Sequence, residues 1–128
     1  MVVPDFLLSR LYRRGSLHQV GELEFSFRLA NVLGDATVIA PPQVEVNGIR
    51  YAPHQVRVKG LDVANVSPTH PFRFSRGDHV TVRLPGHIMA GGNRIRVRVR
   101  TREWGELDIY AEDKARPYCP VPGASEEE

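Results

Sequence analysis

Apolar and polar residues alternate with a period of two along most of the chain, and this pattern constrains the fold more than any other feature. In residues 22–31 (ELEFSFRLAN), one face would carry Leu23, Phe25, Phe27 and Leu29, because successive side chains of a strand point to opposite sides. Similar alternation predicts strands at residues 54–60, 79–84, 94–101 and 106–112. Weaker candidates cover residues 7–12, 16–20, 36–40, 62–66 and 71–74. Helical periodicity is nearly absent, so the chain is predicted to be built from strands.

Proline and glycine residues separate these strand candidates, for example at Pro41-Pro42, Pro85-Gly86 and Gly91-Gly92. Many short strands divided by such residues are typical of antiparallel sandwiches and barrels. We therefore expect an all-β fold, an antiparallel two-sheet β-sandwich of about eight or nine strands with jelly-roll-like connections. The length of 128 residues suits one domain. We place this domain at residues 1–114 and expect an extended, Pro-rich, acidic tail at residues 115–128.

Two hairpins can be predicted in register. Asn47-Gly48 suits the type I′ turn, which needs positive φ at both central residues. The flanking strands then pair Val46 with Ile49 and Val44 with Tyr51 on the inner face, and Glu45 with Arg50 on the outer face.

The second predicted hairpin contains an arginine comb, Arg94 to Arg102 at every second position. A three-residue loop at 103–105 would put Gly105 in the left-handed region. Its register would pair Arg102 with Glu106, Arg100 with Asp108, Arg98 with Tyr110 and Arg96 with Glu112. Acids opposite the arginines would neutralise much of the charge that nucleic acid needs, and the net charge is only +2. A salt-bridged surface is the first interpretation, a protein interface the second, and nucleic-acid binding the least favoured.

Trp104 is predicted at the tip of this hairpin, where its ring either folds back on its own sheet or anchors a partner. Tryptophan and arginine are enriched at interface hot spots. The residues chosen as a candidate partner interface are Trp104, Arg102, Arg98, Tyr110 and Tyr118.

Catalytic and metal-binding patterns are weak. Cys119 is the single cysteine, the five histidines form no H-x-H pair, and the chain has no G-x-S-x-G or Walker motif. We therefore assign no catalytic, cofactor-binding or metal-binding residue, although a histidine cluster assembled by the fold stays open. With no signal peptide and no apolar run long enough to span a bilayer, we expect a cytoplasmic protein without membrane contact.

The chain resembles the small β subunit of C-glycoside deglycosidases over roughly residues 7–113. The resemblance rests on LYRRGSLHQVGELEFSFRLAN, NGIRYAPHQVRV, PFRFSRGDHVTVRLPG and GNRIRVRVRTREWGELDIYAED. It implies a β-sandwich that packs on and supports a TIM-barrel, sugar-isomerase-like α subunit. In that family the α subunit binds a divalent metal and supplies the acid and base groups, and the pair cleaves a carbon–carbon bond in oxidised C-glycosides. The expected function is therefore a non-catalytic β subunit of a carbohydrate-active lyase, and no catalytic residue is carried over.

Two other functions are compatible with the same residues. A stand-alone carbohydrate-binding module would need an aromatic platform, for which Tyr12, Tyr51, Trp104, Tyr110 and Tyr118 are available. A small metal-dependent enzyme of cupin type would need histidines that converge. Self-association through a sheet face or edge is possible in any of these cases.

Overall fold

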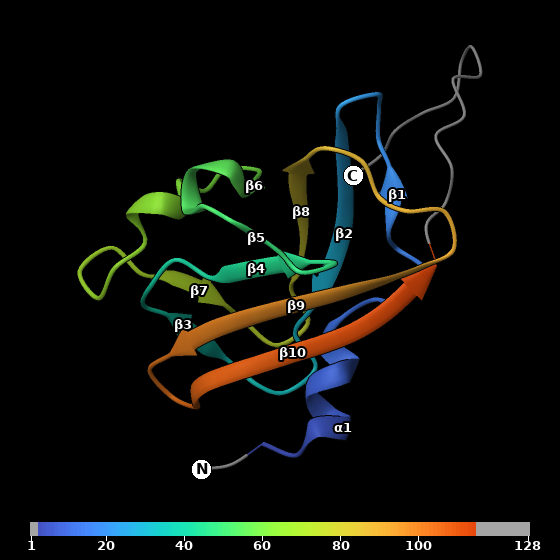
Figure 1. Ribbon diagram of the computed structural model, residues 1–128. Coiled ribbons are helices and arrows are strands. Elements are labelled where there is room, and N and C mark those ends of the chain that lie inside the picture. The colour runs from blue at the N-terminus through green and yellow to red at the C-terminus, as the bar shows by residue number, and fades with distance from the viewer. Residues whose placement is uncertain (1–2, 115–128) are drawn as a thin grey trace.

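The computed structural model describes residues 3–114, which form two antiparallel sheets. Sheet A has the strand order β1 (His18–Gln19), β2 (Glu24–Ala30), β8 (His79–Pro85), β6 (Arg57–Val58). Sheet B contains β5 (Ile49–Tyr51), β4 (Gln43–Val46), β9 (Gly92–Thr101), β3 (Ala36–Val38) and β7 (Phe72–Phe74), with β10 (Gly105–Lys114) paired to β9. The long strands β9 and β10 cross in front of β2 and β8 in Figure 1. The predicted all-β two-sheet sandwich is confirmed, with ten strands within residues 3–114.

Short helical turns replace three predicted strand regions. Helix α1 (Asp5–Leu8) and the 3-10 turn η1 (Ser9–Leu11) occupy the predicted strand at 7–12, and η3 (Val63–Asn65) occupies the one at 62–66. The predicted strand at 54–60 shrinks to β6, because η2 (Pro53–Gln55) precedes it. Proline is favoured at the first position of a helical turn, since its fixed φ already suits it. Short apolar runs do not distinguish a strand from a buried helical turn by periodicity, which explains these errors.

The core lies between the two sheets and follows the predicted alternation. Phe25, Phe27 and Leu84 of sheet A are fully buried. Ile95 and Val97 of sheet B are each only 1% exposed. The prediction of Leu23 as a core residue is wrong, because Leu23 is 75% exposed. The reason is that β2 begins only at Glu24, so Leu23 lies in the preceding bend and is free of the strand's alternation.

The register of the β4–β5 hairpin is confirmed, but Ile49, predicted on the inner face, is 59% exposed. Val46 pairs with Ile49, Glu45 with Arg50 and Val44 with Tyr51. Asn47 and Gly48 have φ values of 53° and 83°, as a type I′ turn requires.

The hairpin of β9 and β10 forms, but the predicted register is wrong by two residues. Arg100 pairs with Glu106, Arg98 with Asp108, Arg96 with Tyr110 and Arg94 with Glu112. The Thr101 hydroxyl accepts the Trp104 N–H at 2.9 Å and donates to the Gly105 carbonyl at 2.9 Å, which closes the turn over residues 102–104. Gly105 has the expected positive φ of 74°, but it begins β10 and pairs with Thr101. Because the shift is an even number of residues, every side chain stays on its predicted face.

A buried carboxylate joins the start of the described chain to its last strand. Asp113, 8% exposed at the end of β10, accepts hydrogen bonds at Oδ2 from the Tyr12 hydroxyl (2.7 Å), the Gly15 N–H (2.9 Å) and the Leu17 N–H (3.3 Å). The Tyr12 ring also packs on Phe27, with 5.6 Å between ring centroids. Burial, together with the hydrogen bond to Asp113, raises the pKa of the Tyr12 phenol far above its ordinary value. This contact is absent from the sequence-based predictions.

Buried side-chain amides hold the loops that connect the strands. Asn31 donates to the carbonyls of Gly34 and Phe74, each at 2.7 Å, and so fixes the loop between β2 and β3 against β7. Asn93 accepts from the Asn47 amide at 2.8 Å and from the Met89 N–H at 2.9 Å. Within residues 3–114, no helix has both the length and the apolar character needed to cross a membrane.

Candidate partner-binding face

The outer face of sheet B consists of the side chains of β9, β10, β4 and β5 that point away from the core. It carries four of the five arginines of the comb. Its cations are Arg50, Arg94, Arg96, Arg98, Arg100 and Lys114, and its acids are Glu45, Glu106, Asp108 and Glu112. These residues carry two more positive than negative charges. Tyr110 lies among them, directly opposite Arg96.

Asp108 organises the centre of this face. Its two carboxylate oxygens accept from Arg96 Nε at 3.0 Å and Arg96 Nη2 at 2.8 Å, the two-pronged geometry that suits a guanidinium. Arg98 Nε lies 3.8 Å from Asp108 Oδ2. The hydrogen bonds from Arg96 lower the pKa of Asp108, and the same bonds raise the pKa of Arg96. The carboxylate therefore fixes the position of Arg96 on the surface.

Other arginines of the comb are less compensated than the sequence suggested. Glu106 and Glu112 lie opposite Arg100 and Arg94 in the register, yet neither arginine forms an ion pair with any residue between 3 and 114. A hollow of about 660 Å³ beside Arg100 has Arg50 and Arg98 in its lining, together with Glu106 and Tyr51. This part of the face could receive an acidic group of a partner.

A second hollow, of about 490 Å³, lies between α1 and β10 and is lined by both exposed aromatic and paired charged residues. Phe6 of α1 is 66% exposed and Tyr110 is 49% exposed. Arg96 and Asp108 also line this hollow. The Tyr110 hydroxyl donates to Glu112 Oε2 at 3.3 Å. Aromatic residues beside arginine are the composition typical of protein interfaces.

Trp104 does not extend into solvent but packs on its own chain. A methyl group at Gly34 would lie 3.3 Å from the Trp104 ring, and the ring N–H donates to the Asp35 carbonyl at 3.3 Å. Of the two alternatives predicted for Trp104, the structure shows the ring folded back. Its half-buried side chain joins the edge of the core.

Contacts with strand β3 and with the loop at Pro68 also hold the turn that carries Trp104. Glu103 accepts from both the Thr37 N–H and the Thr37 hydroxyl at 2.7 Å, and these bonds lower the pKa of Glu103. Exposed Arg102 donates to the Pro68 carbonyl at 3.4 Å.

The predicted interface residues therefore divide into two groups. Arg98 and Tyr110 share the outer face of sheet B, whereas Trp104 and Arg102 contact the loops around Asp35 and Pro68. Tyr118 lies outside the described residues. Phe6 was missed, because the segment that follows it was predicted as a strand rather than as part of a short helix that covers β10.

The histidines are dispersed over the molecule. His54, His70, His79 and His87 are exposed, and half-buried His18 contacts the Ser16 carbonyl at 3.2 Å through Nδ1. In the part of the chain that the structure describes, no three His, Cys, Asp or Glu side chains lie together in an arrangement that could hold a metal ion.

Comparison with protein families corrects the sequence-based resemblance. The matching family model is hydroxymethylglutaryl-CoA reductase, N-terminal domain, and the match covers residues 7–116 of the 128. Comparisons with curated proteins and with solved structures found no match. Assignment to the β subunit of C-glycoside deglycosidases is therefore wrong. It rested on the order of strands and on no diagnostic motif, and unrelated sandwiches can share such an order. The chain belongs to the family of the hydroxymethylglutaryl-CoA reductase N-terminal domain.

Proposed function

We propose that this chain is a non-catalytic, cytoplasmic binding domain that docks on a protein partner through the outer face of sheet B. The observation that carries the proposal is the pair of exposed aromatic residues, Phe6 and Tyr110, beside the fixed Arg96–Asp108 pair. Large aromatic side chains lose unfavourable contact with water when a partner covers them. An arginine already held by a carboxylate loses less side-chain entropy on binding than a free one.

The face also indicates the chemistry of the partner. An apolar side chain of the partner would fill the hollow of about 490 Å³ between Phe6 and Tyr110. An acidic group would enter the neighbouring hollow of about 660 Å³, where Arg50, Arg98 and Arg100 meet. The proposed partner is therefore a protein whose surface presents an apolar residue next to acidic residues.

Family membership supports a domain of this kind. The family is named for the N-terminal domain of an enzyme, which suits a unit that works beside a catalytic part rather than alone. A TIM-barrel partner with a divalent metal, and the carbon–carbon lyase reaction, depended on the deglycosidase resemblance alone. They stay predictions, and the present proposal needs only a protein partner.

The carbohydrate-binding alternative is weakened by the positions of the aromatic residues. Tyr12 is buried, Tyr51 packs edge-on against Phe25 with 6.3 Å between ring centroids, and Trp104 packs on its own chain. Among the aromatic candidates within residues 3–114, Tyr110 is the one classed as exposed. The predicted platform is therefore not formed by these candidates, and the exposed Phe6 beside Tyr110 lines a hollow with a charged pair rather than with a further aromatic ring.

Site-specific photo-crosslinking in the producing cell tests the proposal. A photoreactive phenylalanine analogue placed at Tyr110 should give a specific crosslinked protein, identified by mass spectrometry, whereas the same analogue at exposed Met89 should not. With the identified partner purified, Tyr110→Ala should weaken binding at least tenfold, about 1.4 kcal/mol, and Met89→Ala should leave it unchanged. Equal crosslinking from both positions would refute the proposed face. A product containing two copies of this chain would instead indicate self-association.

A further inference from the structure

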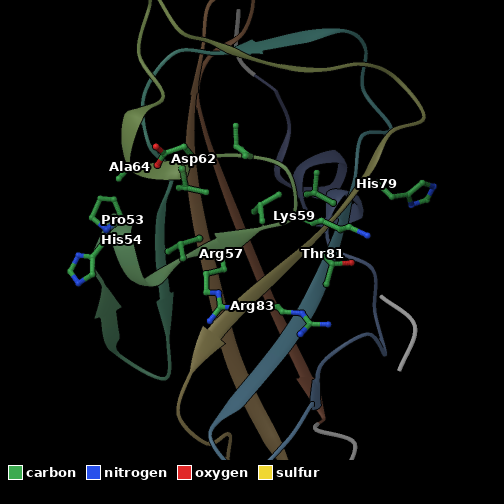
Figure 2. Close-up of a pocket in the computed structure, with 14 residues that line it drawn as sticks. Pro53, His54, Arg57, Lys59, Asp62, Ala64, His79, Thr81 and Arg83 are labelled. Carbon is green, nitrogen blue, oxygen red and sulfur yellow. The ribbon is translucent and has the colours of Figure 1, made fainter. Parts of the chain in front are cut away.

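A hollow of about 810 Å³ lies at the edge of sheet A, away from the proposed partner-binding face. Strands β6 and β8 form its floor, and the turns η2 and η3 form its wall. Its size is within the range of about 300 to 1,000 Å³ that is common for small-molecule sites. Figure 2 shows Arg57, Lys59 and Arg83 in the central part of this lining, with His54 and His79 toward its opposite ends.

The strand register at this hollow places two cations face to face. Arg57 of β6 pairs directly with Arg83 of β8, and like charges directly opposite each other destabilise an antiparallel pair. Arg83 has a counter-charge, since its Nη1 lies 3.6 Å from Glu24 Oε1. Arg57 forms no ion pair with any residue in the described range. An anion between the two guanidinium groups would supply Arg57 with a counter-charge and offset the repulsion across this pair.

The other lining residues add to this preference for an anion. Lys59 supplies a third cation, and Thr81 supplies a hydroxyl on the same face of β8 as Arg83. Asp62 is the single acid of the lining, and its carboxylate accepts from the Asn65 side chain instead of from a lining cation. The lining thus carries two more positive than negative charges, or one more when Glu24 is counted.

From this arrangement we infer that the hollow binds a small phosphorylated molecule, with its phosphoryl group between Arg57 and Arg83. Guanidinium groups bind phosphate oxygens through two parallel N–H donors. A dianion placed there would remove the repulsion between the paired strands and would reach Lys59 and Thr81. The limited extent of the cationic surface favours a small molecule over a polymer, for which a longer basic stripe would be needed.

Titration calorimetry of the full-length chain with pyrophosphate tests the inference. Wild-type protein should bind one equivalent, and Arg57→Gln should weaken binding at least tenfold. Arg57→Lys keeps the charge but loses the planar pair of donors, so it should be intermediate. Arg73→Gln is the matched control, because it removes one exposed arginine from β7 of the other sheet and should bind pyrophosphate as the wild type does.

Thermal denaturation provides a second readout that does not depend on measuring weak binding. Without ligand, Arg57→Gln should melt at or above the wild-type temperature, since it removes the repulsion from Arg83. Pyrophosphate should raise the melting temperature of wild type and Arg73→Gln more than that of Arg57→Gln.

Several outcomes would overturn the inference. These are no saturable binding of pyrophosphate, equal binding by Arg57→Gln and wild type, or tighter binding of the dicarboxylate malonate than of pyrophosphate. Binding of a long oligonucleotide without binding of pyrophosphate would also overturn it, since the site would then belong to a polymer.

Discussion

Replacing Asp113 by asparagine should destabilise the protein strongly, although the two side chains have nearly the same shape. Four donors surround this carboxylate: the Tyr12 hydroxyl and the N–H groups of Gly15 and Leu17 at Oδ2, and the Lys114 N–H at Oδ1. An amide has one acceptor oxygen and one NH₂ group. In either orientation, the NH₂ group of asparagine would face a donor.

The size of the effect follows from the hydrogen bonds. The less disruptive orientation keeps an oxygen toward Tyr12, Gly15 and Leu17 and turns the NH₂ group toward Lys114. Three bonds then change from charge-assisted to neutral, a loss of about 1 kcal/mol each. With the lost bond from the Lys114 N–H added, we expect Asp113→Asn to lower the free energy of unfolding by about 4 kcal/mol, a large part of the stability of a domain of this size.

Urea denaturation at pH 7, followed by circular dichroism, measures this difference. The matched control is Glu106→Gln, the same chemical change at an exposed position on the same strand, which should alter the free energy of unfolding by less than about 0.5 kcal/mol. A change below about 1 kcal/mol for Asp113→Asn, with an unchanged m-value, would refute the idea that this carboxylate holds the first segment to β10.

Three further predictions concern single side chains. The raised pKa of Tyr12 means that the folded state keeps the phenol proton, so stability should fall as pH rises above the ordinary pKa of 10.0. In alkaline denaturation, Tyr12→Phe should make this loss of stability less steep. An unchanged dependence on pH would contradict the role of the Tyr12 phenol. Trp104→Ala should lower the free energy of unfolding by about 2 kcal/mol in urea denaturation, because a half-buried ring leaves the core edge; a change near zero would contradict packing on its own chain. Asp108→Arg should lower the free energy of unfolding by about 1 kcal/mol, because Arg96 and Arg98 would then meet a like charge on an exposed face. The effect should be smaller in 1 M salt. An equal loss at low and high salt would contradict an electrostatic origin.

The sequence predicted the fold best where local chemistry decides the structure. The β4–β5 hairpin is correct to the residue, because Asn47-Gly48 determines both the turn and the register. The alternation of buried and exposed residues along β9 and β10 is also correct. The predicted register of β9 and β10 is wrong, because the position of the turn depends on contacts with residues that are distant in sequence. Among these are the bonds between Glu103 and Thr37, which is far away in the sequence.

The candidate site was predicted only in part for a related reason. Arg98 and Tyr110 could be placed on one face from their spacing, but Phe6 reaches that face through a helix that the sequence pattern did not indicate. The opposition of Arg57 and Arg83 depends on the pairing of β6 with β8, which are distant in sequence. Asp113 did offer a signal, since it lies at an inward position of an alternating strand, where a lone acid needs partners.

The contact between Tyr12 and Asp113 spans 101 residues of chain, and this has a consequence for biosynthesis. At about 5 to 20 residues per second, a ribosome needs roughly 5 to 20 seconds to add the stretch between the two residues. During that time the nascent segment around Leu17 lacks the acceptor that fixes it, while its apolar side chains are already made. The turns around Tyr12 and Leu17 therefore reach their final arrangement only after β10 has been translated.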